Sequence, residues 1–155
     1  MKLKLTERIR IKKEEPKVYE AMFFAEKQIA GFGLDKKLVE LVKIRASQLN
    51  GCGYCLDKHC RDARESGETE QRLHTLAAWR ETPFFTEQEQ AALQLTEEVT
   101  YISKEGVKAE TYHSVVALFG EQGFAQLLFL ILTINNWNRI AIATHMMLEV
   151  TVSQE

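Results

Sequence analysis

The segment Asn50-Gly51-Cys52-Gly53-Tyr54-Cys55-Leu56-Asp57-Lys58-His59-Cys60 decides how the rest of this chain must be arranged. It holds all three cysteines of the 155-residue protein, and a histidine stands four residues after the second cysteine. Thiols and an imidazole gathered in one short segment indicate chemistry rather than packing. The remaining sequence must then form a scaffold that holds these side chains in place.

The sequence on both sides of this segment predicts helices. Apolar residues recur at helical spacing between start and stop signals. The clearest start is Thr86-Glu87-Gln88-Glu89, which has the pattern of a capping box. No segment shows the alternating pattern of a strand. We therefore predict an all-α fold with helices over residues 16–31, 35–50, 54–66, 69–79, 86–99, 112–120 and 121–147. Arg45 falls within an apolar stripe, so we expect it to be partly buried beside an acidic partner.

Length and composition favour one globular domain. The chain is 45% hydrophobic and 27% charged, and it is long enough to bury a core of its own. We expect residues 1–15 to form a charged N-terminal arm, residues 16–150 the helical domain, and residues 151–155 a C-terminal tail. The net charge of -2 gives no basic surface for nucleic acid.

Two features bear on location and assembly. The first residues lack the continuous apolar run of a signal peptide, so we expect a cytoplasmic protein. The most apolar run, residues 124–134, is too short to span a bilayer, and no membrane association is expected. The helix that contains this run is apolar on nearly every side, which favours burial in a homo-oligomer.

Helical spacing separates the cysteines into different roles. His59 lies one turn from Cys55 on the same helix face, whereas it is two turns, roughly 10 Å, from Cys52. A helix N-terminus and a neighbouring histidine both favour a thiolate over a thiol. We therefore predict Cys55 as the nucleophile and Cys52 as the resolving thiol. Cys60 projects about 140° away from Cys55, which indicates packing.

Three other interpretations of this segment, a zinc site, a c-type haem site and a thioredoxin-like motif, can be compared with the sequence. Cys52, Cys55, His59 and Cys60 are zinc-ligand types, but Cys60 points away from the others on a regular helix, so we expect no metal. A c-type haem requires histidine directly after the second cysteine, where Leu56 stands. A thioredoxin-like domain needs a strand before the motif, and a helix is predicted there. No cofactor is expected.

Several segments together resemble the alkylhydroperoxidase D-like branch of the carboxymuconolactone decarboxylase superfamily. They are Glu40, the run Arg45-Ala46-Ser47-Gln48-Leu49-Asn50-Gly51-Cys52-Gly53-Tyr54-Cys55 with His59, residues 67–73 and 79–84, and Glu97. This resemblance implies a single-domain bundle of about six to eight helices, with the Cys-x-x-Cys motif at the N-terminus of a core helix. It also implies homo-oligomers such as trimers or hexamers.

The same resemblance implies an antioxidant enzyme that reduces organic hydroperoxides. Cys55 would attack the peroxide, Cys52 would resolve the product, and His59 with Glu40 would relay protons. A dithiol, such as a lipoyl group or a thioredoxin-like protein, would restore the thiols. Tyr54 stands where the best-known member has a second histidine; it is an auxiliary candidate whose phenol, with an ordinary pKa of about 10, shuttles protons poorly near pH 7.

Three alternatives stay open at this point. A Cys52–Cys55 disulfide could act as a non-enzymatic redox sensor that changes a surface or an assembly. A lactone decarboxylase is less favoured, because members with that activity lack the cysteine pair. A zinc protein is the third alternative.

Overall fold

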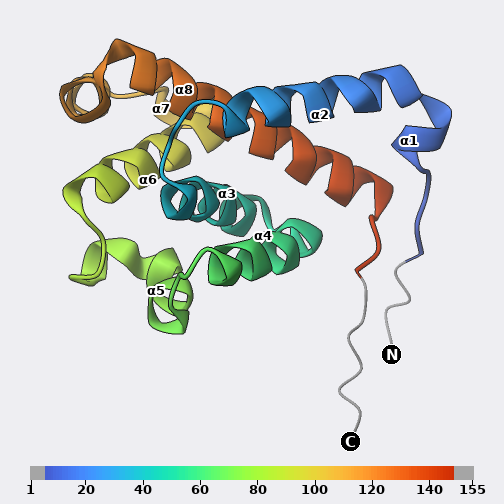
Figure 1. Cartoon of the computed structure of the whole chain (residues 1–155), viewed down its shortest axis with the longest axis horizontal. Helices are drawn as coiled ribbons and strands as arrows, with labels where there is room; N and C mark the ends of the chain where they lie inside the picture. The colour runs from blue at the N-terminus through green and yellow to red at the C-terminus, as the bar shows by residue number, and fades with distance from the viewer. Residues whose placement is uncertain (1–5, 149–155) are drawn as a thin grey trace, which may run out of the picture.

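The computed structural model describes residues 6–148, and every regular element in that range is helical. This confirms the predicted all-α fold. In chain order the elements are α1 (Ile11–Glu14), α2 (Pro16–Ala30), α3 (Lys36–Asn50), α4 (Gly53–Glu65), α5 (Glu70–Thr75), a 3₁₀ helix η1 (Leu76–Glu81), α6 (Glu87–Thr100), α7 (Ile102–Glu105) and α8 (Ala109–Thr144). Figure 1 shows α3 in the middle of the bundle, with α8 and α2 along one side and α4 along the other.

The core lies where α3 meets α6 and α8. Leu41 and Val42 of α3 are fully buried, as is Leu95 of α6. From α8, Leu127 and Ile131 complete this layer and are also fully buried. α4 packs against α3, so the cysteine segment rests on a helix that also contacts α6 and α8.

Local signals in the sequence set several helix ends. Asp35 accepts a hydrogen bond from the backbone N–H of Leu38 at 3.0 Å and so begins α3. Gly51 ends that helix with a left-handed φ of 69°, which turns the chain directly into Cys52. Thr86 and Glu89 form the predicted capping box at the start of α6.

Several predicted elements differ from the structure, and the helix predicted from residue 112 already begins at Ala109. The helix predicted over residues 69–79 ends at Thr75 and continues as the 3₁₀ helix η1, inside which Ala78 leaves helical geometry at φ −119°. A short helix, α7, forms where a loop was expected. The last helix ends at Thr144 rather than at Met147, because His145 adopts a left-handed φ of 54°. Gly120 breaks α8 internally, as predicted, with φ 74°.

The N-terminal arm is tied to the end of α8. Arg8 donates its backbone N–H to the carbonyl of Thr144 at 2.9 Å, and its guanidinium donates to the carbonyl of Ala143 at 3.2 Å. Residues 11–14 of the arm form α1. The arm therefore lies next to the C-terminal half of α8, one of the helices that border the site described below.

The predicted acidic partner of Arg45 is Glu97 on α6. The guanidinium donates to the Glu97 carboxylate at 2.9 Å, and the Arg45 side chain is only 13% exposed. Glu97 also accepts hydrogen bonds from the Trp79 indole and from Arg80, at 2.9 and 2.8 Å. One carboxylate thus joins α3, η1 and α6 at a single point.

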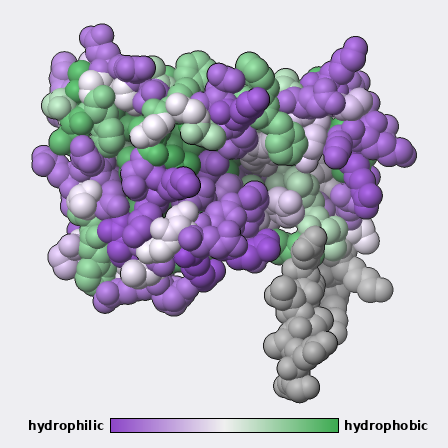
Figure 2. Space-filling view, viewed as in Figure 1, coloured by the Kyte–Doolittle hydropathy of each residue, from purple (hydrophilic) through white to green (hydrophobic). Residues whose placement is uncertain are grey.

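α8 is not buried on every side within one chain. Leu130 and Ile134 are fully buried, but Phe129 and Leu132 on the same stretch are 60% and 42% exposed. By length and composition alone this helix would suffice to cross a membrane, and its buried face supplies the core of the bundle. Figure 2 shows a mostly hydrophilic face, with apolar side chains gathered at the upper left and a hollow between α4 and α8.

Candidate active site

Cys52 caps the helix that carries the rest of the motif. It stands at the N-cap position of α4, in extended geometry, directly after the left-handed turn at Gly51. Its sulfur accepts a hydrogen bond from the backbone N–H of Cys55 at 3.3 Å. The thiol therefore takes the place that a serine or aspartate oxygen usually occupies at a helix start. The motif lies at the N-terminus of a core helix, as predicted.

Both motif sulfurs are buried. Cys52 is 1% exposed and Cys55 is 3% exposed, and they pack with Ala46 of α3 and with Ile134 and Ala141 of α8. All three cysteines of the chain are free thiols in this structure. The two sulfurs thus form a reduced, protected pair between three helices.

The two thiols have opposite pKa shifts. A hydrogen bond from the Cys55 thiol is the main cause that lowers the pKa of Cys52 to about 7, against the cost of burial. The pKa of Cys55 is raised, first by that same hydrogen bond and then by burial. The first negative charge of the pair is therefore stabilised at Cys52, the residue predicted as the resolving thiol. The cap position adds to this, because hydrogen bonds from the backbone N–H groups of Cys55 and Tyr54 also lower the pKa of Cys52.

A buried amide adjoins both thiols and was not predicted from the sequence. Asn138 of α8 is fully buried, and it donates to the hydroxyl of Ser47 at 2.9 Å while accepting from Asn50 at 2.9 Å. Hydrogen bonds from Asn138 lower the pKa of Cys52 and oppose the rise in the pKa of Cys55. The only sequence signal for this residue is a polar side chain on the apolar face between Ile134 and Ala141.

His59 and Glu40 meet as the resemblance implies. The Nδ1 atom of His59 lies 2.8 Å from a carboxylate oxygen of Glu40, and the two side chains are 8% and 13% exposed. An ionised carboxylate can only accept, so Nδ1 carries the proton in this contact. In the neutral ring Nε2 is then the nitrogen that can accept a proton. Periodicity alone would have assigned Glu40 to a solvated surface.

The same imidazole nitrogen faces a second acid, Asp62. The distance from His59 Nδ1 to the Asp62 carboxylate is 3.7 Å, and Asp62 also pairs with Lys58 at 2.7 Å. Within residues 6–148, the ligand atoms close enough to share a metal ion belong to Glu40, His59 and Asp62, a set without any cysteine. The zinc set built on the cysteines therefore has no counterpart in this part of the chain.

Cys60 lies apart from the motif pair. It is partly exposed and packs against the cluster that contains Leu41, Leu73 and Trp79, whereas Cys52 and Cys55 belong to a different cluster. Burial raises the pKa of the Cys60 thiol. Cys60 thus contacts apolar side chains away from the motif pair, and its packing role stays a prediction.

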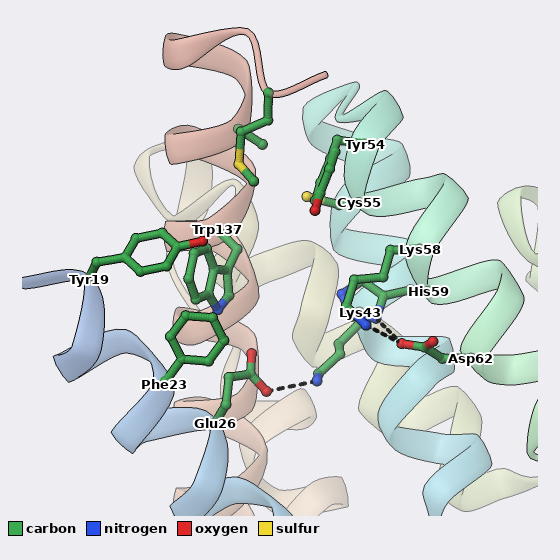
Figure 3. Close-up of a pocket in the computed structure, with 12 residues that line it drawn as sticks. Tyr19, Phe23, Glu26, Lys43, Tyr54, Cys55, Lys58, His59, Asp62 and Trp137 are labelled. Atoms are coloured by element: carbon green, nitrogen blue, oxygen red, sulfur yellow. Dashed lines mark hydrogen bonds and ion pairs between the residues drawn. The ribbon is translucent and has the colours of Figure 1, made fainter. Parts of the chain in front are cut away.

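A cavity of about 290 Å³ opens in front of Cys55. Figure 3 shows Trp137, Tyr19 and Phe23 along one wall, with Tyr54, Cys55 and His59 across from them. The cavity is lined by Tyr19, Phe23, Glu26, Lys43, Tyr54, Cys55, Lys58, His59, Asp62, Trp137, Ala141 and Met146. Of the two motif cysteines, Cys55 borders this cavity, so a small molecule would reach its sulfur first. The sequence had singled out none of the residues on the aromatic wall.

Comparison with protein families identifies the chain's relatives. The model of the carboxymuconolactone decarboxylase family matches residues 14–98. The uncharacterised protein YdfG of Bacillus subtilis (strain 168) is 40% identical over 139 residues, which cover 90% of this chain and 95% of YdfG.

Solved structures share the fold. The crystal structure of a protein of unknown function from Agrobacterium tumefaciens, for which the role of the antioxidant defence protein AhpD has been suggested, is 33% identical. It matches with a TM-score of 0.90 over 94% of this chain and 99% of that chain. The debrominase Bmp8 has a TM-score of 0.75 at 18% identity, covering 88% of this chain and 73% of Bmp8, a likeness that shows the common fold alone.

Proposed function

The chain belongs to the carboxymuconolactone decarboxylase family, and we propose that it is a thiol-dependent peroxidase that reduces organic hydroperoxides with Cys52 and Cys55. One observation carries the proposal. A buried thiol pair lies beside a cavity that also receives His59, and Glu40 holds that imidazole in one orientation. A nucleophile, a base and a group that orients the base are the parts that such a reaction needs. The suggested role of the Agrobacterium relative supports the same class of activity.

The first step is attack by Cys55, because its sulfur faces the cavity. The sulfur attacks the terminal peroxide oxygen, the O–O bond breaks as the S–O bond forms, and the alkoxide leaves with a proton as the alcohol. The product at Cys55 is a sulfenic acid. Nε2 of His59 is the base and acid for these proton movements, since Glu40 occupies Nδ1.

The stabilised charge at Cys52 fits this sequence of steps. A hydrogen bond from the Cys55 thiol lowers the pKa of Cys52, so in the proposed cycle the first charge of the pair rests at Cys52. Transfer of the Cys55 proton to Cys52, or to His59, generates the Cys55 thiolate when a peroxide is bound. Cys52 then attacks the sulfenate sulfur, hydroxide leaves as water after protonation, and a disulfide forms. The pair loses two electrons and the peroxide gains two, so each turnover yields one alcohol and one water.

The cycle closes when an external dithiol reduces the Cys52–Cys55 disulfide. A lipoyl group or a thioredoxin-like protein has the required chemistry, because either can attack a disulfide and form its own. Tyr54, next to Cys55, lines the cavity and is positioned to hydrogen-bond a bound peroxide as an auxiliary group. The proposal thus covers both substrates of the reaction, the organic hydroperoxide and the reducing dithiol.

We propose that the protein assembles through the outer face of α8. Phe129 and Leu132 are large apolar side chains left exposed on the helix that the sequence predicts to be covered. Apolar side chains gathered on an otherwise polar surface typify subunit contacts. A homo-oligomer, a trimer or a hexamer, would cover them.

The proposal is tested by peroxide consumption. Reduced protein is mixed with an organic hydroperoxide and an excess of dithiol, and loss of peroxide is followed over many equivalents. The expected result is catalytic consumption that is abolished by Cys55→Ser and retained by the matched control Cys60→Ser. Oxidation of one equivalent without turnover would instead support the redox-sensor alternative and refute the enzyme.

A further inference from the structure

An aromatic wall faces Cys55 across the cavity. Tyr19 and Phe23 of α2 and Trp137 of α8 contact one another edge to face, with ring centroids 5.1 to 5.5 Å apart. Each ring holds the other two, so this wall is formed before any ligand arrives. Figure 3 shows the three rings grouped on one side, opposite Tyr54 and Cys55.

The wall leaves aromatic surface for a ligand to cover. Phe23 is 53% exposed although it belongs to the cluster. The cavity, at about 290 Å³, is about twice the size of a cavity of roughly 150 Å³ that holds benzene. It therefore has room for one aromatic ring and a short branch that carries a hydroperoxide.

The charged groups at the polar end of the cavity are paired with one another. Lys43 binds Glu26 at 3.0 Å, and Lys58 binds Asp62 at 2.7 Å. A substrate carboxylate would have to displace one of these acids from its lysine, and it would lie near the other. The pairing therefore favours a neutral molecule over an anionic one such as a fatty-acid hydroperoxide.

From these contacts we propose that the cavity binds the organic group of a neutral, aryl-substituted hydroperoxide. The aryl ring packs against Phe23 and Trp137, and the hydroperoxide lies at Cys55. This proposal rests on the peroxidase function proposed above and names its substrate class. Dispersion and ring–ring contacts along this wall give the selectivity, because hydrogen peroxide cannot make them.

The first test compares substrates and wall variants by kcat/KM. The substrates are cumene hydroperoxide (neutral, aryl), tert-butyl hydroperoxide (neutral, without a ring), linoleic acid hydroperoxide (anionic) and hydrogen peroxide. We expect cumene hydroperoxide to be the best of the four. Phe23→Ala should lower kcat/KM for it about three- to tenfold, mainly through KM, and leave hydrogen peroxide unchanged.

Phe24→Ala is the matched control. Phe24 is the next residue of α2, is 66% exposed and does not line the cavity. Its replacement should therefore leave kcat/KM unchanged for both cumene hydroperoxide and hydrogen peroxide. Phe23→Leu keeps apolar volume without a ring, so its kcat/KM for cumene hydroperoxide should lie between those of the wild type and Phe23→Ala. This graded result distinguishes loss of the ring from loss of folding. Equal losses for Phe23→Ala and Phe24→Ala, or a better rate with the anionic substrate, would overturn the proposal.

A second test needs no turnover. Binding of cumyl alcohol, the unreactive product, is measured by its quenching of Trp137 fluorescence in a Trp79→Phe background. Saturable binding of cumyl alcohol that weakens about three- to tenfold in Phe23→Ala supports the aryl site. If such binding is found but no peroxide is consumed, only the peroxidase proposal fails. Turnover of all neutral peroxides at one rate, with no binding of cumyl alcohol, refutes the aryl site and leaves the peroxidase intact.

Discussion

Replacing Cys55 by alanine should raise the pKa of Cys52. In the structure a hydrogen bond from the Cys55 thiol is the largest cause that lowers the Cys52 pKa from 9.0 to about 7. The alanine variant loses that donor but keeps the backbone N–H at residue 55 and the amide of Asn138. Burial of Cys52 still opposes the charge. We therefore expect its pKa to move back toward 9.0.

The expected change is large at neutral pH. A thiol with a pKa of about 7 is half ionised at pH 7. With a pKa near 9 only about one per cent is ionised, so the thiolate population falls about fiftyfold. A serine at position 55 still offers a hydroxyl donor, and Cys55→Ser should give a pKa between those of Cys55→Ala and the parent.

The assay is the ultraviolet absorbance of thiolate as a function of pH, in reduced protein that carries Cys60→Ser. The parent should show a transition near pH 7, and Cys55→Ala should shift it upward by up to about two pH units. The diagnostic result is a pKa of Cys52 that rises in the order parent, Cys55→Ser, Cys55→Ala. A transition that stays near pH 7 in Cys55→Ala would show that the helix start alone holds the charge, and would refute the role given to the hydrogen bond from Cys55.

Three further predictions concern the base, the core and the outer surface. Glu40→Gln should lower kcat/KM about ten- to a hundredfold, because an amide replaces the carboxylate that holds Nδ1 of His59; an unchanged kcat/KM would show that Glu40 does not orient the base. Glu97→Gln should cost about 1–3 kcal/mol in urea unfolding at pH 7. In the wild type, hydrogen bonds hold the pKa of Glu97 below the usual 4.5 despite burial. The wild type therefore loses its extra stability over Glu97→Gln as the pH falls through that lowered pKa. A difference in unfolding free energy that stays the same in acid would contradict this prediction. Phe129→Asp should reduce the mass seen in sedimentation, and an unchanged mass would exclude this face of α8 from the interface.

The fold was predictable because its signals are local. A capping box starts α6, a capping aspartate starts α3, and a left-handed glycine ends α3. Each acts within one helical turn, so sequence alone shows it. The boundaries that failed depend on packing instead: α5 gives way to a 3₁₀ helix at Leu76, and α8 ends at Thr144, before the left-handed His145, where no glycine or proline stands in the sequence.

From spacing alone, the site was predictable only where it lies on one helix, and Glu40 of α3 came from the family resemblance. Cys52 caps α4, Cys55 and His59 lie on it, and their spacing reports their proximity. Asn138 contacts Ser47 from 91 residues away, and no periodicity relates the two. The aromatic wall likewise joins α2 to the C-terminal part of α8, and it forms only because these two helices pack against each other. Substrate selectivity therefore belongs to a level of structure that motif spacing does not encode.

Spacing within α4 does not report which cysteine of the pair has the lowered pKa. Helical periodicity relates side chains on the helix surface, and by that measure His59 belongs to Cys55. Cys52 stands outside this periodicity, because an N-cap side chain folds back over the first turn and receives its unpaired N–H groups. That position contributes to the lowered pKa of Cys52, while the cavity borders Cys55. For the peroxidase that we propose, the stabilised charge and the accessible sulfur are thus divided between the two cysteines, and proton transfer along the hydrogen bond between them would move the charge to the sulfur that reacts.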